Sequence, residues 1–171
     1  QSLRRELEET RQLIGIKDGE IAALQERLAG LALADIGTAE REAGLGAEAV
    51  MCAPDIDQLH VVNHLTGEVE EGASRNVLVE SARIARGAIR DVVDVSADEL
   101  DALILPGGFG AAKNLCDFAV NGADCNVDSG VADLVRAVHG QGKPVGPVCI
   151  APALIAKVLG EEGPELTICN D

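Results

Sequence analysis

The sequence has almost no aromatic side chains, since it contains two Phe and neither Trp nor Tyr. Proteins that bind single-stranded nucleic acid use aromatic rings as stacking platforms and basic groups to neutralise phosphates. Basic groups are also scarce here, because 14 Lys and Arg face 29 Asp and Glu and leave a net charge of −15. We therefore expect no nucleic acid among the partners.

Long apolar runs and closely spaced cysteines are missing too. No run approaches the ~20 residues of a membrane-spanning helix, and the charged first residues lack the apolar core of a secretory signal. We expect no membrane partner and a cytoplasmic location. The five cysteines are widely spaced and include no C-x-x-C pair, so we expect no metal site.

The chain is long enough to bury a core, which must consist of Ala, Val, Leu and Ile. Hydrophobic residues make up 47% of its 171 residues. The composition changes along the chain and predicts three parts. Residues 1–34 form a charged helix, residues 35–47 are a Gly- and Ala-rich junction, and residues 48–171 form an α/β domain.

The predicted helix at 1–34 carries an apolar residue at every seventh position, namely Leu7, Ile14, Ile21 and Leu28. This heptad pattern is typical of a coiled coil and predicts a homodimer. Polar residues interrupt the second seam position, so an amphipathic helix lying on its own domain is the alternative.

Apolar runs alternate with helical patterns from residue 48 onward, which predicts a parallel sheet covered by helices on both faces. Three helix starts carry capping signals. These are Ser74 before "RNVLVESARI", Ser96 with Glu99 in "SADELD", and Asp128 before "SGVADLVRAVHG".

Two of the apolar runs end in Gly-containing turns, "ALILPGGFG" and "KPVGPVCIAPAL". Functional sites in parallel α/β sheets lie at the carboxyl ends of the strands. Cys149 follows one such strand and precedes a helix, whose N-terminus favours a thiolate. We predict that Cys149 is a nucleophile and that the backbone amides of Gly108 and Ile150 face one oxyanion. The alternative is a buried core cysteine.

The turn at Gly107 and Gly108 lacks the G-x-G-x-x-G spacing of a dinucleotide site. We expect it to supply backbone amides instead, and we expect no cofactor. The three histidines, His60, His64 and His139, are expected to have surface or structural roles.

Four strings, "APDIDQLHVVNHLTGE", "RNVLVESARIARG", "ELDALILPGGFGAAKNLCDFA" and "GKPVGPVCIAPALIAKVLG", resemble the ElbB-type glyoxalase-like branch. This branch belongs to the PfpI-type, class I glutamine amidotransferase-like superfamily. The resemblance covers residues 48–171. It implies a flavodoxin-like α/β sandwich in three layers, a nucleophile at Cys149, and oxyanion donors at Gly107 and Gly108.

The resemblance also implies a reaction without a cofactor, in which a 2-oxoaldehyde such as glyoxal becomes a 2-hydroxy acid. Family members begin with a strand, a Gly-rich loop and a Glu that acts as acid and base. That segment is not recognisable here, and Glu20 in "KDGEIAAL" is the candidate for the acid. Without its first strand the sheet is expected to be incomplete, with two strands lacking a neighbour.

Two functions therefore remain open. One is a glyoxalase-like enzyme that uses Cys149. The other is a non-catalytic scaffold that oligomerises through residues 1–34 or senses oxidants through Cys149. An amidotransferase is disfavoured, because no His-x-Glu pair follows Cys149 to complete a triad.

Overall fold

A computed structural model of the chain describes residues 46–166. The chain divides into two compact units, Gln1–Leu45 and Gly46–Asp171, and the description below concerns the second. The predicted helix at 1–34 lies outside the described residues, as does nearly all of the junction at 35–47. The predicted division into helix, junction and domain therefore stays a prediction.

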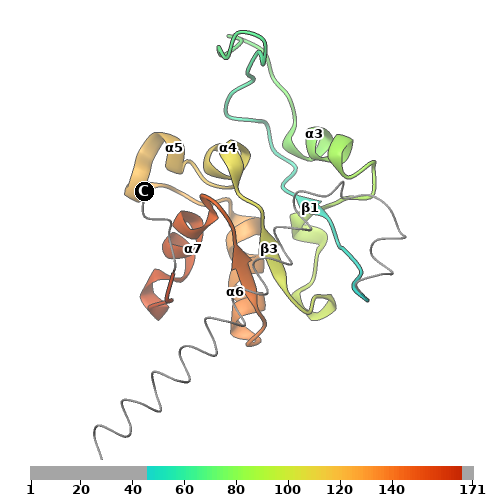
Figure 1. The fold of residues 1–171 in the computed structure, drawn as a ribbon, viewed down its shortest axis with the longest axis vertical. Coiled ribbons are helices and arrows are strands. Elements are labelled where there is room, and N and C mark those ends of the chain that lie inside the picture. Colours follow the sequence, from blue (N-terminus) through green and yellow to red (C-terminus); the bar gives the residue numbers. More distant parts are fainter. Residues whose placement is uncertain (1–45, 167–171) are drawn as a thin grey trace, which may run out of the picture. The chain divides into compact units, whose positions relative to one another are not determined.

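The described unit is an α/β fold with parallel strands (Figure 1). β1 (Cys52–Ala53) pairs with β2 (Arg90–Asp91), and β3 (Leu103–Leu105) pairs with β4 (Val145–Pro147). In the second pair Leu103 lies opposite Val145 and Leu105 opposite Pro147. Helix α3 (Val77–Ile84) lies between β1 and β2 in the chain, and α6 (Ser129–Gly140) lies between β3 and β4. The predicted alternation of strands and helices is therefore confirmed.

Helix α7 (Ala151–Leu159) follows β4 and leads into η5 (Gly160–Glu162). Short helical segments occupy the connections between strands, namely η1 (Val92–Asp94), η2 (Ala97–Glu99), α4 (Gly108–Gly110), the π-helix η3 (Ala111–Leu115), α5 (Phe118–Asn121) and η4 (Gly122–Asp124). None of the helices within residues 46–166 is long and apolar enough to cross a membrane.

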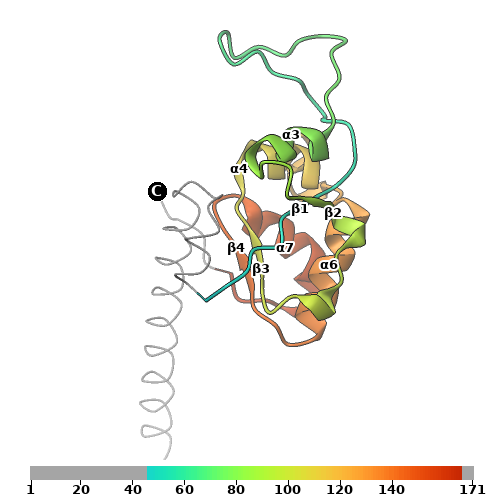
Figure 2. The same cartoon turned by 90° about the vertical axis from the view of Figure 1, so that its right-hand side faces the viewer.

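The two strand pairs do not form one continuous sheet within the described residues, in keeping with the incomplete sheet that we expected. Figure 2 shows β1 beside β2 and β3 beside β4. A hollow is lined by Cys52–Pro54 on the β1 side and by Leu103–Pro106 on the β3 side. Sheets of the 2-1-3-4-5 order place their first strand between the second and the third. Among residues 46–166 no strand lies there, so one edge of β1 and one edge of β3 lack a neighbour.

The core lies between the β3–β4 pair and the helices α6 and α7. Val135, Val138, Leu154 and Leu159 are at most 2% exposed. Gly130, in the first turn of α6, lets the helix approach η1 closely, because a Cβ there would stand 2.8 Å from Val93 Cγ1. The apolar stripes of the two helices thus fix the position of β4, which leads into Cys149.

Asn76 rather than Ser74 caps α3, which corrects our prediction. Its Oδ1 accepts a hydrogen bond from the Val79 N–H at 2.9 Å, while its Nδ2 donates to Asp55 Oδ1 at 2.6 Å. The other two predicted caps are confirmed. Ser96 and Glu99 form a capping box at η2, and Asp128 Oδ1 accepts from the Val131 N–H.

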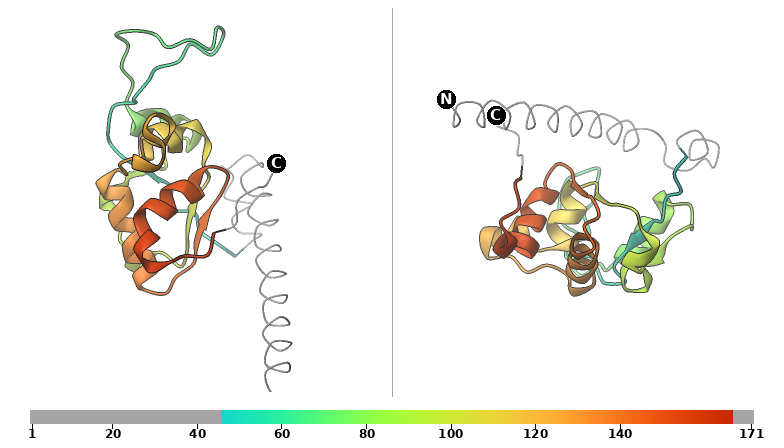
Figure 3. Two further views of the ribbon diagram at one scale, coloured as in Figure 1. Left: turned by 90° about the vertical axis from the view of Figure 1, so that its left-hand side faces the viewer. Right: turned by 90° about the horizontal axis from the view of Figure 1, so that it is seen from below.

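The segment between β1 and α3 forms an extended arm that projects from the unit (Figure 3, left). Antiparallel bridges join Asp57 to Asn76 and Val62 to Val69. The turn at its tip leaves Leu65 98% exposed. Val61, in contrast, is 3% exposed, so the arm is packed at Val61 and exposed at its tip.

Candidate active site

Cys149 stands on a sharp turn between β4 and α7. Its backbone has φ +59°, in the left-handed region that side chains other than glycine rarely adopt. The turn is fixed on both sides, because the Val148 N–H donates to Leu105 O at 2.9 Å and the Ala151 N–H donates to Val148 O at 3.1 Å. The cysteine is exposed and free. A strained turn that presents a side chain between a strand and a helix is the geometry of a nucleophile elbow.

Gly107 brings the glycine turn after β3 against this elbow. It has φ +84°, and a Cβ on it would overlap Val148 O and stand 2.9 Å from Cys149 Cβ. The same Cβ would stand 3.3 Å from Ile150 N. Only glycine satisfies both the backbone conformation and the close approach. The structure therefore brings together Cys149, Gly107 and Ile150.

Backbone donors are available around this contact. Gly108 is the first residue of α4, so its N–H has no acceptor within that helix. Among residues 46–166, the Ile150 N–H makes no turn, loop or cap hydrogen bond to a backbone oxygen. Ile150 also immediately precedes α7, whose N-terminus carries a partial positive charge. These two N–H groups are the donors that we predicted for an oxyanion, and that role stays a prediction.

No histidine or carboxylate contacts the thiol within residues 46–166, where Cys149 makes no side-chain hydrogen bond or ion pair. Glu20 lies outside the described residues, so its role stays a prediction. His139 is engaged elsewhere, since its Nδ1 lies 3.0 Å from Glu162 Oε2 at the end of α6. His60 and His64 are exposed on the arm.

Three residues near the glycine turn were not singled out from the sequence. Phe109 is 79% exposed, and Lys113 Nζ lies 5.5 Å from the centre of its ring. Asn114 Oδ1 accepts a hydrogen bond from the Leu59 N–H at 2.9 Å and so ties the base of the arm to the π-helix. All three belong to the string "GGFGAAKN". The hydrogen bond from Leu59 to Asn114 joins positions 55 residues apart, so no local pattern contains it.

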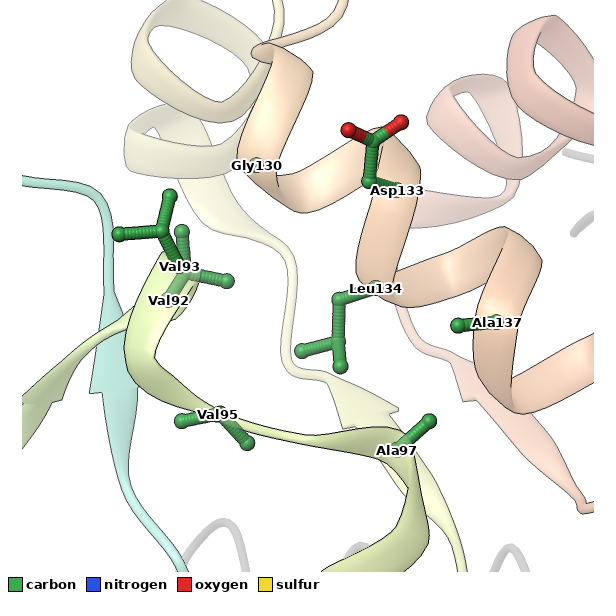
Figure 4. A pocket seen from close by; sticks show the side chains of 8 residues that line it. All are labelled: Val92, Val93, Val95, Ala97, Gly130, Asp133, Leu134 and Ala137. Carbon is green, nitrogen blue, oxygen red and sulfur yellow. The ribbon is translucent and has the colours of Figure 1, made fainter.

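A hollow of about 250 Å³ lies between η1, η2 and α6, and it does not include Cys149 or Gly107. Figure 4 shows mainly aliphatic side chains around it, with the Asp133 carboxylate directed away from Val95 and Leu134. It contains no cysteine or histidine, so we assign no chemistry to it.

Comparisons with known proteins found relatives over most of the described unit. The chain is 55% identical over 126 residues to "Glutamine amidotransferase-like class 1 domain-containing protein 3, mitochondrial" from Homo sapiens. It is 54% identical over 126 residues to "ES1 protein homolog, mitochondrial" from Rattus norvegicus. It is 34% identical over 118 residues to "ES1 protein, mitochondrial" from Danio rerio.

These alignments cover 74%, 74% and 67% of this chain, but only 46%, 47% and 44% of the relatives. The chain therefore spans less than half the length of these relatives. No family model matches the chain.

A solved structure from Ehrlichia chaffeensis is also similar. It is an "isoprenoid biosynthesis protein with amidotransferase-like domain", 35% identical in sequence, with a TM-score of 0.64. The match covers 70% of this chain and 56% of that one. It confirms the predicted flavodoxin-like α/β class.

The predicted cytoplasmic location is wrong, because all three relatives are named as mitochondrial proteins. Our prediction relied on the missing apolar core of a secretory signal. Mitochondrial transit peptides are amphipathic and rich in Arg and Ser, so the absence of an apolar core does not argue against them.

Proposed function

We propose that the chain belongs to the class I glutamine amidotransferase-like superfamily, as its similarity to the relatives and to the solved structure supports, and that Cys149 is the nucleophile of a reaction on a small carbonyl compound. The reaction is the glyoxalase-like conversion of a 2-oxoaldehyde to a 2-hydroxy acid, as in the ElbB-type branch. The observation that carries the proposal is the exposed Cys149, held at φ +59° against Gly107. The relatives' names suggest a mitochondrial setting.

The first step in this proposal is attack of the Cys149 thiolate on the aldehyde carbon. A carbon–sulfur bond forms, and the carbonyl π electrons move onto oxygen to give a hemithioacetal oxyanion. The N–H groups of Gly108 and Ile150 stabilise this charge, since donors that are already oriented need no reorganisation as it develops. Protonation of the oxygen gives the neutral hemithioacetal.

The second step moves a proton from the former aldehyde carbon to the neighbouring carbon through an enediol. The product is a thioester, which water hydrolyses to release the 2-hydroxy acid and regenerate the thiol. The step needs a base. Our candidate for the base is Glu20 in "KDGEIAAL", which lies outside the described residues. Within residues 46–166 no carboxylate or imidazole is hydrogen-bonded to Cys149.

The test is turnover of glyoxal by the full chain and by Cys149→Ser, with product acid measured directly. We expect the substitution to lower kcat/KM by about 10³-fold or more, as loss of a nucleophile typically does. Cys52→Ser is the matched control, because Cys52 lies in β1 and takes no part in the elbow. Equal turnover in Cys149→Ser and the unmodified chain would refute the assignment.

The reactivity of the thiol can be measured independently of any substrate. We would follow iodoacetamide labelling of each cysteine against pH, peptide by peptide. An unperturbed cysteine titrates near ~8.5. Labelling of Cys149 that is fast well below that pH supports a nucleophile, whereas labelling like that of an ordinary exposed thiol contradicts it.

A non-catalytic scaffold is the second candidate, favoured by the lack of an acid or base in contact with Cys149 in the described part of the chain. In this alternative, residues 1–34 form a homodimer and Cys149 has no chemical role. Sedimentation of the full chain against a chain that begins at Gly46 distinguishes the two. A dimer lost on truncation, together with no glyoxal turnover, favours the scaffold.

A further inference from the structure

Two buried cysteines that the proposed reaction does not use lie side by side below α5. Cys116 is 6% exposed and Cys125 is 1% exposed. Cys116 pairs with Val127 in an antiparallel bridge, and the Asp117 N–H donates to Asn126 O at 3.1 Å. This register places Cys125 diagonally across from Cys116.

The Cys125 thiol lies close enough to Cys116 to act on it electrostatically. Burial raises the pKa of the Cys116 thiol, and the neighbouring Cys125 thiol adds to this rise. Cys116 Sγ donates to Ala111 O at 3.3 Å. Both cysteines are free thiols.

The segment between the two cysteines, which holds α5 and η4, is largely exposed. α5 and η4 contain no buried residue, and Val120 within α5 is 61% exposed. Neither of these helices has a side-chain cap at its first turn. Segments with few buried contacts open at low free-energy cost, which gives a small oxidant access to the sulfurs.

We propose that Cys116 and Cys125 are a site of disulfide formation, with hydrogen peroxide as the oxidant. One sulfur attacks a peroxide oxygen, the O–O bond breaks, and a sulfenic acid forms with release of water. The second sulfur attacks the sulfenic sulfur, the S–O bond breaks, and a second water leaves. The two thiols together lose two electrons and two protons, and the peroxide is reduced to water.

The disulfide would act on the π-helix η3 next to the candidate active site. Cys116 ends this helix through two donors to Ala111 O, its N–H at 3.0 Å and its Sγ–H. Oxidation removes the second donor, because a disulfide sulfur carries no hydrogen. This inference stands apart from the role of Cys149, and its test does not use glyoxal turnover.

The test treats the full chain with hydrogen peroxide, blocks the remaining thiols with N-ethylmaleimide, and digests it with trypsin without reductant. Both cysteines fall in one peptide, residues 114–136, which has no internal Lys or Arg. We expect this peptide to lose two hydrogens and to take no label. After reduction it should take one label on each cysteine.

Cys116→Ser and Cys125→Ser should each abolish the label-resistant form, and Cys52→Ser, the matched control, should retain it. The measurement on the unmodified chain is decisive even if a variant folds poorly. Labelling of both cysteines in the folded, peroxide-treated chain would overturn the proposal. A bond from either cysteine to Cys52, Cys149 or Cys169, or pairing only in urea, would overturn it equally.

Discussion

At the scale of single residues, the most specific prediction about the site concerns Gly107. Its φ of +84° and the contact with Cys149 Cβ exclude any side chain. Gly108 is a matched control, because it has φ +80° but no atom within 4 Å of the position that a Cβ would occupy. A left-handed backbone costs an Ala about 1–2 kcal/mol. We expect Gly108→Ala to lose about that much stability, and Gly107→Ala to lose more.

Urea unfolding followed by far-UV circular dichroism checks this expectation, since the chain has no Trp or Tyr for fluorescence. Labelling of Cys149 provides the second measurement. We expect Gly107→Ala to change the labelling rate, because the added methyl displaces the elbow. Equal stability and equal labelling in the two variants would show that the turn does not touch the elbow.

Asp117 gives a prediction about pH. The hydrogen bond from the Asn126 N–H, at 2.7 Å, holds the pKa of the Asp117 carboxyl below its usual value. A carboxyl with a lowered folded-state pKa stabilises the protein above its unfolded pKa of about 3.9, and this stability is lost as pH falls through the folded value. Below about pH 4, we expect the unfolding free energy of Asp117→Asn to fall less steeply with decreasing pH than that of the unmodified chain. An unchanged acid limb of the curve would contradict this expectation.

At the scale of elements, the start of α3 shows how tertiary contacts, rather than the local sequence, decide which residue caps the helix. Ser74 and Asn76 are both good capping residues, and the sequence alone favoured the wrong one. The bridge from Asp57 to Asn76 and the hydrogen bond from Asn76 to Asp55 fix the start of the helix at Asn76. These contacts join segments far apart in the chain, so no local pattern contains them.

The two positions therefore form a matched pair of substitutions. Asn76→Ala removes the cap and should cost about 0.5–2 kcal/mol of unfolding free energy. Ser74→Ala should stay within about 0.5 kcal/mol, as exposed substitutions usually do. Urea unfolding of the two variants measures the difference. A larger loss for Ser74→Ala would place the cap where the sequence suggested.

At the scale of the whole molecule, the α/β class and the position of Cys149 were predictable, because both follow from short patterns. Apolar runs alternate with helical spacing, and a cysteine stands where a strand gives way to a helix. The contact of Gly107 with the elbow and the bond from Leu59 to Asn114 were not predictable, since each joins distant segments. The break between the two strand pairs was expected from the family resemblance, because the family's first strand is not recognisable here, and not from composition.

Among residues 46–166 one edge of β3 has no paired strand, and this edge has a consequence for solubility. Strand edges with free N–H and C=O groups act as templates for other strands. β3 carries no charged residue, and Ile104 at its centre is 43% exposed. The net charge of −15 keeps copies of the chain apart, and salt screens that repulsion within a Debye length of about 8 Å at physiological ionic strength. Ordered self-association of this protein would therefore begin at β3 and would be favoured by salt.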